Sequence, residues 1–191
     1  MEIRTSISHP LQINVLDFSK YTKYSGKIGM TFCAGKKQFS AYSNVLWDRD
    51  LTTDVSVIKQ WGADIWLNLM EDKDLVSVKL DPENFSRTIK TAGIEYLHYP
   101  IVDGSVPDKR ESLLWDNERI PALLSRIKDG CKILIHCRGG LGRTGLIAAR
   151  LLIAAGIKPI DAIAIVRDVR TGTIENDLQE KWLINRDIFD N

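Results

Sequence analysis

Residues 137–145 contain the side chains of this chain that are best suited to catalysis: one cysteine, two arginines and a threonine, with four glycines and a leucine, in the order CRGGLGRTG. A short apolar run precedes this stretch and a longer apolar segment follows it, so it is expected to connect a strand to the first turn of a helix. Unpaired backbone N–H groups point outward at a helix N-terminus, where the helix dipole also favours negative charge. A connection of this kind is suited to holding an anion.

The glycines give this connection its expected shape. Because glycine tolerates positive φ angles, the loop can curl until successive N–H groups converge on one anion. Arg143 opens the helix, and its guanidinium can grip two oxygens of a tetrahedral oxyanion. The loop is not a Walker A motif, because no Gly-Lys-Ser/Thr follows the glycines. The residues expected to bind substrate are Arg138, Gly139, Gly140, Leu141 and Gly142.

Cys137 is the first residue of the loop and the candidate nucleophile. Helix N-termini and nearby cations stabilise thiolates, which are the nucleophilic form of cysteine. A thiolate beneath a bound anion is placed to attack it, and the Thr144 hydroxyl can donate a hydrogen bond to that thiolate. The plain alternative, a buried core cysteine, fits poorly with three glycines and a flanking arginine.

The reaction of a thiolate with a phosphate ester also needs a proton for the leaving oxygen. Asp103 follows a predicted strand and begins the loop DGSVPD, the kind of segment that often carries function. Asp108 is the competing carboxylate. It follows Pro107 and precedes a helical stretch, so it is better explained as a helix-capping residue. We therefore expect Asp103 to be the general acid.

Predicted strands and helices alternate along the chain. Strands are expected at 11–16, 27–32, 64–70, 94–99 and 132–136, and helices at 52–62, 82–92, 111–128, 144–155, 159–170 and 175–189. The helix at 52–62 begins with Thr and Asp, which are good N-cap residues, and Pro121 marks a break or fresh start. This order predicts an α/β fold with a central, largely parallel sheet flanked by helices. Ligands of such folds bind beyond the carboxyl ends of strands, where the loop lies.

Composition narrows the class of protein. The 191 residues suit a single domain, 1–191, and no Pro/Gly/Ser-rich linker divides them. A net charge of +1 argues against general binding to nucleic acid or to a membrane surface, and no apolar run reaches the length of a membrane span. The three cysteines form neither a disulfide framework nor a metal site by spacing. Without an apolar N-terminal leader, a cytoplasmic location is expected, with no cofactor.

The stretch HCRGGLGRTG resembles the Cys-x5-Arg loop of the protein tyrosine and dual-specificity phosphatases, His-Cys-x-x-Gly-x-x-Arg-Ser/Thr-Gly. The resemblance implies that Cys137 is the nucleophile and Arg143 the phosphate-binding arginine. It further implies that Thr144 assists release of the cysteinyl-phosphate and that His136 orders the loop. PIVDGSVPD resembles the general-acid loop of the cyclin-dependent kinase-associated and mitotic-exit groups of this superfamily, in which Asp103 matches the acid.

The likeness covers about residues 28–185. Residues 166–179 resemble the late segment that supplies a glutamine to position the hydrolytic water. Gln179 is the best match, although Glu175, Asn176 and Asp177 make this segment more acidic than in relatives. The resemblance implies a phosphatase-like three-layer architecture. It also implies metal-independent hydrolysis of phosphoprotein monoesters, on phosphotyrosine and on phosphoserine or phosphothreonine, through a cysteinyl-phosphate.

Three rival readings stay open. A rhodanese-type sulfurtransferase would need neither Asp103 nor Thr144, and a non-catalytic phosphoprotein-binding module would usually have lost the cysteine, arginine or acid. A phosphoinositide or small-ester phosphatase would carry more lysine in the loop than this chain, which has Leu141. Elsewhere, Lys36 and Lys37 are candidates for flanking the substrate, although a solvated turn is the favoured interpretation. Trp47 and Trp115 are candidates for lining a cleft.

Overall fold

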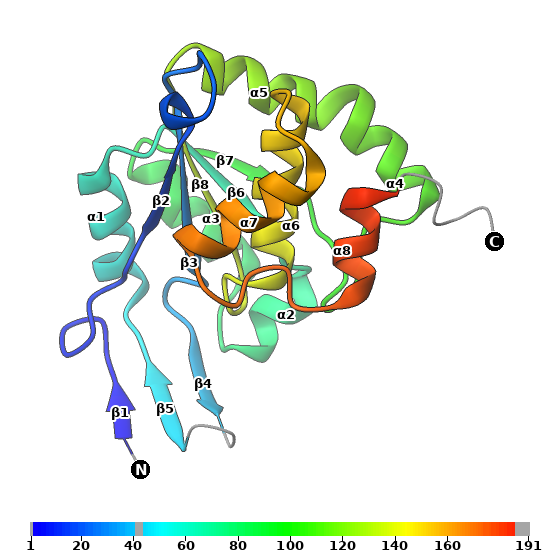
Figure 1. Ribbon diagram of the computed structural model, residues 1–191. Coiled ribbons are helices and arrows are strands. Elements are labelled where there is room, and N and C mark those ends of the chain that lie inside the picture. The colour runs from blue at the N-terminus through cyan, green and yellow to red at the C-terminus, as the bar shows by residue number, and fades with distance from the viewer. Residues whose placement is uncertain (1, 41–43, 186–191) are drawn as a thin grey trace.

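The computed structural model describes residues 2–40 and 44–185, and its centre is a five-stranded sheet in the order β2-β3-β8-β6-β7 (Figure 1). Four strands run parallel: β3 (Lys27–Phe32), β8 (Lys132–Cys137), β6 (Ile65–Asn68) and β7 (Glu95–His98). The edge strand β2 (Asn14–Asp17) is antiparallel to β3. The expected α/β fold with a largely parallel sheet is confirmed.

Helices cover both faces of this sheet (Figure 1). One face carries α1 (Leu51–Trp61) and α3 (Pro82–Thr91). The other face carries α6 (Gly142–Ala154) and α7 (Pro159–Val169), with α5 (Ile120–Lys128) and α8 (Asp177–Ile184) packed against α6. Strand β6 is buried at every position, as expected for a parallel strand covered on both sides. The expected three layers are therefore present.

The start of α1 differs from expectation for a local reason, whereas the end of α3 agrees with it. Helix α1 is capped by Asp50, whose side chain accepts a hydrogen bond from Thr53 N at 2.7 Å. Asp54, the aspartate expected with threonine to cap it, is instead buried and bound to the guanidinium of Arg49 at 2.7 and 2.8 Å. The helix α3 ends at a glycine as expected, since Gly93 has a φ of +81°.

The segment predicted as one helix with a proline break is continuous. It consists of α4 (Lys109–Leu114), a π-helical turn (Trp115–Arg119) and α5. Pro121 lies in the first turn of α5, directly after the wider π turn. Proline has no N–H to donate, and a widened turn accommodates its ring, so the direction of the helix is kept.

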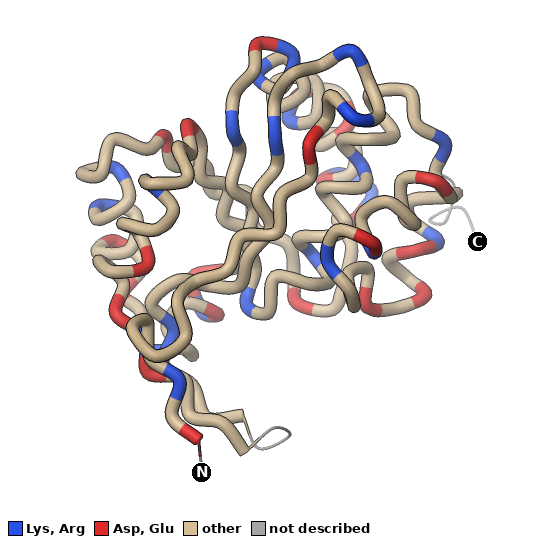
Figure 2. The backbone as a smooth tube through the Cα atoms, turned by 60° about the vertical axis from the view of Figure 1, so that its left-hand side comes forward, with Lys and Arg blue, Asp and Glu red and all other residues tan. Residues whose placement is uncertain are grey.

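A second, smaller sheet was not predicted. Its strands are β1 (Glu2–Arg4), β5 (Val45–Asp48) and β4 (Lys37–Ser40), with β1 parallel and β4 antiparallel to β5. It projects from the body of the molecule on the side where β3 ends (Figures 1 and 2). Helix α2 (Asp72–Ser77) and the 3-10 turn Phe18–Lys20 were also not predicted. The small sheet and α2 both border the loop that follows β8.

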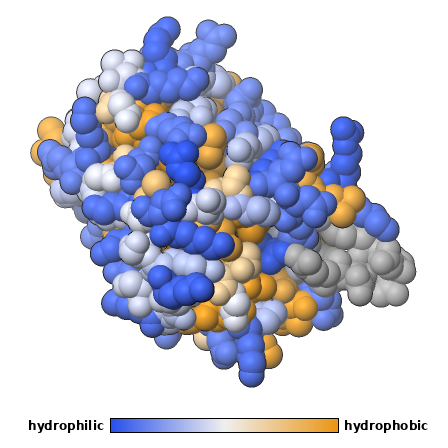
Figure 3. All heavy atoms as spheres, turned by 90° about the horizontal axis from the view of Figure 1, so that it is seen from above, coloured by the Kyte–Doolittle hydropathy of each residue, from blue (hydrophilic) through white to orange (hydrophobic). Residues whose placement is uncertain are grey.

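The surface of the described residues is mixed in character. Acidic and basic residues are interspersed along the chain, and apolar side chains alternate with polar ones on the face seen from above (Figures 2 and 3). Within residues 2–40 and 44–185 no helix is long and apolar enough to cross a membrane. In the same ranges no three His, Cys, Asp or Glu side chains are grouped so that they would hold a metal ion.

Candidate active site

Cys137 is the last residue of β8, the middle strand of the central sheet. Because β8 is flanked by β3 and β6, the loop that follows it lies at the centre of the carboxyl edge. The cysteine is 3% exposed and lines a cavity of about 260 Å³. The other residues that line this cavity are Lys36, Gln38, Ser40, Trp47, Asp103, Arg138, Gly139 and Glu175.

The three loop glycines have different roles. Gly140 has a φ of +68°, and a Cβ there would lie 2.2 Å from the carbonyl oxygen of Thr31 on β3. A Cβ on Gly142 would lie 2.2 Å from the carboxylate at the end of the Glu175 side chain, so a larger residue at this position would displace that carboxylate. Gly139 has neither a positive φ nor a neighbour closer than 3.9 Å to such a Cβ. The expectation that all three allow the curl through positive φ is therefore correct for Gly140 alone.

Arg143 is held from one side and open on the other. Its side chain is 1% exposed, and Nη1 donates to Asp74 Oδ2 at 2.7 Å and to the carbonyl of Ile101 at 3.0 Å. Nε and Nη2 are buried and form no hydrogen bond with any described residue, although Nη2 approaches Asp103 Oδ1 to 2.8 Å. Burial disfavours the charged form of Arg143 and lowers its pKa. The attraction of Cys137, Asp74 and Asp103 is stronger in sum, so the pKa of Arg143 is raised overall. Two adjacent donors of a permanent cation are thus available to a phosphate.

Asp74 is a site residue that the sequence analysis missed. Its carboxylate joins both arginines of the loop, with Oδ2 on Arg143 and Oδ1 3.3 Å from Arg138 Nη2. Arg138 also donates to Ser77 Oγ at 2.7 Å. The first turn of α2 fixes Asp74, where it forms a capping box with Glu71. A single aspartate inside the charged run EDKD carries no signal of this role before the fold is known.

Asp74→Asn is expected to lower kcat/KM for a phosphopeptide by about 10²-fold, because a small misplacement of Arg143 removes its aligned contact with phosphate. Steady-state kinetics with the same peptide measures it. The matched control is Asp72→Asn on the same helix, whose carboxylate is largely exposed and lies 3.9 Å from His98. Equal loss in both variants would contradict a specific role for Asp74.

Arg170 is a second residue missed by sequence analysis. It follows α7, and its guanidinium donates to the carbonyl of Gly140 at 2.6 Å and to that of Gly139 at 3.1 Å. A third bond, to Asn14 Oδ1 at 2.6 Å, ties the same side chain to β2. Burial lowers the pKa of Arg170. By holding the loop carbonyls on the outside, Arg170 favours the conformation in which the N–H groups face inward.

Asp103 lies at the cavity, as predicted. Its side chain is 56% exposed, and its carboxylate is 2.8 Å from Arg143 Nη2. The competing Asp108 caps α4, where its side chain accepts a hydrogen bond from Glu111 N at 2.8 Å. The structure therefore separates the two carboxylates as the sequence analysis expected, one at the cavity and one at a helix end.

The loop of Asp103 is tied to the start of α8. Asn176 Nδ2 donates to the carbonyl of Gly104 at 2.9 Å, and Gln179 Nε2 donates to that of Ser105 at 3.4 Å. Gln179 is fully buried, and its Oε1 accepts from Glu175 N at 2.9 Å. Both ends of the Gln179 amide are thus occupied by backbone groups. The side chain of this segment that lines the cavity is Glu175, so a water-positioning role for Gln179 stays a prediction.

His136 and Thr144 are both buried beside the loop. The His136 ring packs against Trp66 at 5.6 Å and Phe85 at 5.7 Å, and neither ring nitrogen bonds to a described residue. Burial lowers the pKa of His136 to about 3, so the ring is neutral and acts by packing. Thr144 Oγ1 likewise bonds to none of the described residues, so the expected hydrogen bond to Cys137 is not formed here.

The burial of His136 predicts a pH-dependent stability. The unfolded state takes up a proton near pH 6.5, whereas the folded state takes it up only near pH 3, so this contribution is complete above pH 6.5 and declines as pH falls toward 3. The free energy of unfolding should decrease by up to about 1.4 kcal/mol per pH unit within that window. Urea unfolding from pH 7 to 4.5 measures the slope. His136→Phe should flatten it, whereas His9→Asn at an exposed position should not.

Comparison with known proteins agrees with this site. Residues 50–187 match the family described as dual specificity phosphatase, catalytic domain. Cyclin-dependent kinase inhibitor 3 of Mus musculus is 42% identical over 176 residues, which cover 91% of this chain and 77% of that protein. The Rattus norvegicus protein of the same name is 43% identical over 94 residues, but these cover 48% of this chain and only 42% of the rat protein.

The chain is also similar to a solved phosphatase structure. Kinase associated phosphatase, with its catalytic-site cysteine replaced by serine, aligns with a TM-score of 0.79 and 29% identity. The alignment covers 93% of this chain and 94% of that one. The fold, the cysteine loop with its arginine, and the family match together show that the chain belongs to the dual specificity phosphatase family, whose catalysis is cysteine-based.

Proposed function

We propose that this protein removes phosphate from phosphoproteins without a metal ion, using Cys137 as nucleophile. The observation that carries the proposal is the arrangement around Arg143. Its buried Nε forms no hydrogen bond with a described residue, its Nη2 faces the cavity-lining Asp103, and the first residue of the same loop is the cavity-lining thiol. Asp103 stands at the same cavity. Nucleophile, oxyanion donors and proton donor thus surround one space.

In the first step the thiolate of Cys137 attacks phosphorus in line with the leaving oxygen. The S–P bond forms, the P–O bond to the alcohol or phenol breaks, and Asp103 gives its proton to the departing oxygen. Arg143 and the loop N–H groups hold the equatorial oxygens, where negative charge is concentrated. Because phosphate needs Arg143 Nη2, substrate binding takes this donor from the Asp103 carboxylate and leaves Asp103 free to face the leaving group.

In the second step Asp103, now a carboxylate, takes a proton from water. The water oxygen attacks phosphorus, the S–P bond breaks, and inorganic phosphate and the thiolate are released. Among the described cavity residues, Glu175 is the other carboxylate beside Asp103. The Gln179 amide and the Glu175 carboxylate both lie close to Gly142 of the cysteine loop. Through its bond to Ser105, Gln179 supports the segment from which Asp103 acts in both steps.

The proposed substrates are phosphoproteins, with phosphotyrosine as the first side chain to test and phosphoserine and phosphothreonine as further ones. We place the protein in the cytoplasm. The three described cysteines, Cys33, Cys131 and Cys137, are unpaired, which supports a reducing compartment. The name of the rodent relatives refers to cyclin-dependent kinases, and a phosphorylated kinase of that class is a candidate phosphoprotein substrate here.

Hydrolysis of para-nitrophenyl phosphate by the freshly reduced protein in excess EDTA tests the proposal. Turnover should persist in EDTA, and acid quenching with a radiolabelled phosphopeptide should leave label on the peptide that contains Cys137. Absence of turnover on both the small ester and the phosphopeptides would overturn the proposed activity. Turnover that depends on added metal would overturn the mechanism.

A further inference from the structure

A lysine lies inside the active-site cavity, held between two aromatic rings. Lys36 immediately precedes β4 and is 7% exposed. Its Nζ is 4.5 Å from the ring centroid of Phe32 and 4.4 Å from that of Trp47. The expectation that Lys36 belongs to a solvated turn is wrong, because β4 folds back over the cavity. The expectation that Trp47 lines a cleft is confirmed, whereas Trp115, of which the same was expected, is fully buried.

Lys36 differs from its neighbours in having no anionic partner. Among the described residues none forms a hydrogen bond or ion pair with its Nζ. Lys37, on the adjacent position, pairs with Asp48 at 3.2 Å, and the buried Arg49 pairs with Asp54 at 2.7 Å. Lysine is seldom buried unless it is paired, since desolvation of an ammonium is costly. A buried cation that opens onto a binding cavity therefore points to an anion brought by the ligand.

The charges facing Lys36 come from several elements. Burial lowers the pKa of Lys36 to about 8, and the nearby Arg49 and Arg170 act in the same direction, while Cys33 and Cys137 oppose them. The amine is still mainly protonated at neutral pH, and a bound anion would stabilise the protonated form. The geometry above, rather than this shift, identifies the site.

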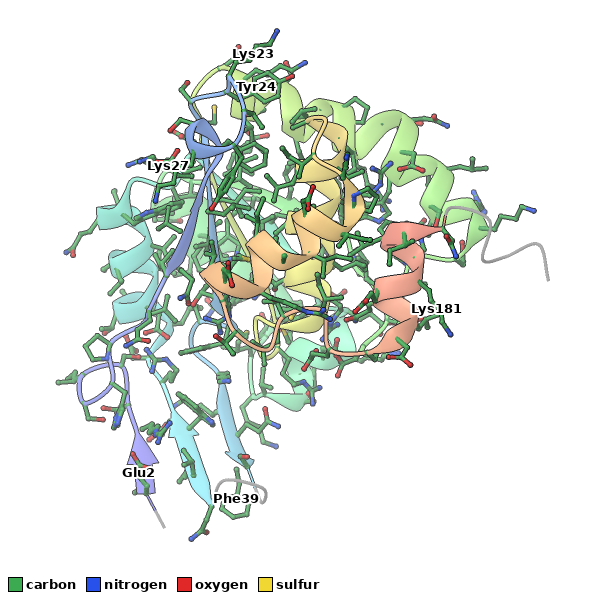
Figure 4. All side chains as sticks on the ribbon, viewed as in Figure 1. Glu2, Lys23, Tyr24, Lys27, Phe39 and Lys181 are labelled. Carbon is green, nitrogen blue, oxygen red and sulfur yellow. The ribbon has the colours of Figure 1, made fainter. Side chains whose placement is uncertain are left out.

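The cavity is lined by both basic and acidic side chains. Lys36, just before β4, and Gln38 and Ser40 on β4 alternate along the chain and line the cavity together with Trp47 and Arg138. Phe39, between Gln38 and Ser40 in sequence, is exposed at the outer tip of the small sheet (Figure 4). Two carboxylates from other segments, Asp103 and Glu175, also line the cavity.

The scissile phosphate already has its own partners, the loop N–H groups and Nε and Nη2 of Arg143, which belong to α6 and its preceding loop. Lys36 lies outside that loop, immediately before β4, and lines the same cavity. We therefore assign Lys36 to a substrate group other than the scissile phosphate.

We propose that Lys36 and Trp47 form a subsite for a second anionic group of the substrate, next to the phosphorylated residue in a phosphopeptide. The group is a carboxylate or a second phosphate, since both present oxygens that an ammonium binds. The Trp47 and Phe32 rings fix the lysine stem, so little side-chain freedom is lost on binding. This proposal rests on the proposed function, because it assigns specificity to the same cavity.

The test compares phosphotyrosine peptides that differ only in the residues directly before and after the phosphotyrosine. These neighbouring residues are alanine, glutamate or a residue with a non-hydrolysable phosphonate side chain. For the wild-type protein, kcat/KM should be about tenfold higher with glutamate or phosphonate than with alanine, as for a charge-assisted hydrogen bond. Lys36→Met keeps the stem between the rings and should abolish the preference. Lys36→Arg should restore it, and Lys37→Met should leave it unchanged.

The outcomes separate this inference from the proposed function. Absence of turnover with every peptide overturns the phosphatase activity itself. Turnover with equal kcat/KM for all peptides overturns the subsite alone, and this is measured on the wild-type protein before any variant is made. A preference that persists in Lys36→Met also overturns it. The size of the preference with phosphonate relative to glutamate tells which anion the subsite takes.

Discussion

Cys137→Ser is expected to lower kcat for para-nitrophenyl phosphate by about 10⁴-fold or more, as removal of a covalent nucleophile does in other hydrolases. A serine hydroxyl needs a base to become a nucleophile, and no histidine is among the described residues that line the cavity. The nearest in sequence, His136, is buried among aromatic rings and is not one of the residues that line the cavity. Stopped assays with high enzyme concentration measure the residual rate.

The same variant should still bind phosphopeptide, because the loop, Arg143 and Arg170 are unchanged. Isothermal titration with a phosphotyrosine peptide would show this binding without turnover. Cys131→Ser is the matched control, since Cys131 precedes β8 at the opposite end from the loop and should keep full activity. Residual turnover of a few per cent in Cys137→Ser, or equal loss in Cys131→Ser, would refute the assignment of the nucleophile.

Asp103→Asn is expected to reduce kcat by about 10²- to 10⁴-fold with phosphopeptides, the usual contribution of a positioned proton donor. The loss should be smaller with para-nitrophenyl phosphate, because its phenolate leaves without full protonation. A series of aryl phosphates with increasing leaving-group pKa measures the difference. The variant should show a steeper dependence of kcat on that pKa than the wild-type protein.

Asp108→Asn distinguishes the two candidate acids. Asp108 is occupied as the N-cap of α4, so its replacement should leave the leaving-group dependence unchanged and lower the free energy of unfolding by about 1 kcal/mol or less. If Asp108→Asn, and not Asp103→Asn, showed the steeper dependence of kcat on the leaving-group pKa, the general acid would have been assigned to the wrong carboxylate.

Regular periodicity and local signals made most of the fold predictable. The apolar run of β8, the glycine after α3 and the strand–loop–helix order around Cys137 are properties of short sequence windows. The small sheet lacks such signals. Its strands have three or four residues each, β4 reads the largely polar KQFS, and β1 pairs with the distant β5, where Glu2 lies opposite Val45.

The candidate site divides in the same way. The cysteine, arginine and acid are specified by a spaced motif, whereas Asp74, Arg170 and Lys36 act through positions that only the fold brings near the loop. Each is a charged residue in a charged neighbourhood, indistinguishable in sequence from solvated surface. Their roles come from burial and hydrogen-bond partners, which depend on packing and have no local pattern.

Arg170 is hydrogen-bonded to the cysteine loop, and Asn176 and Gln179 are hydrogen-bonded to the Asp103 loop. All three residues are synthesised after the loops that they hold. On the ribosome, the nucleophile and the acid emerge before the residues that hold them in place. A nascent chain that ends before residue 170 carries the whole spaced motif and none of these clamps. The enzyme therefore gains its activity late in its own synthesis, after the thiol has already been exposed to the cell.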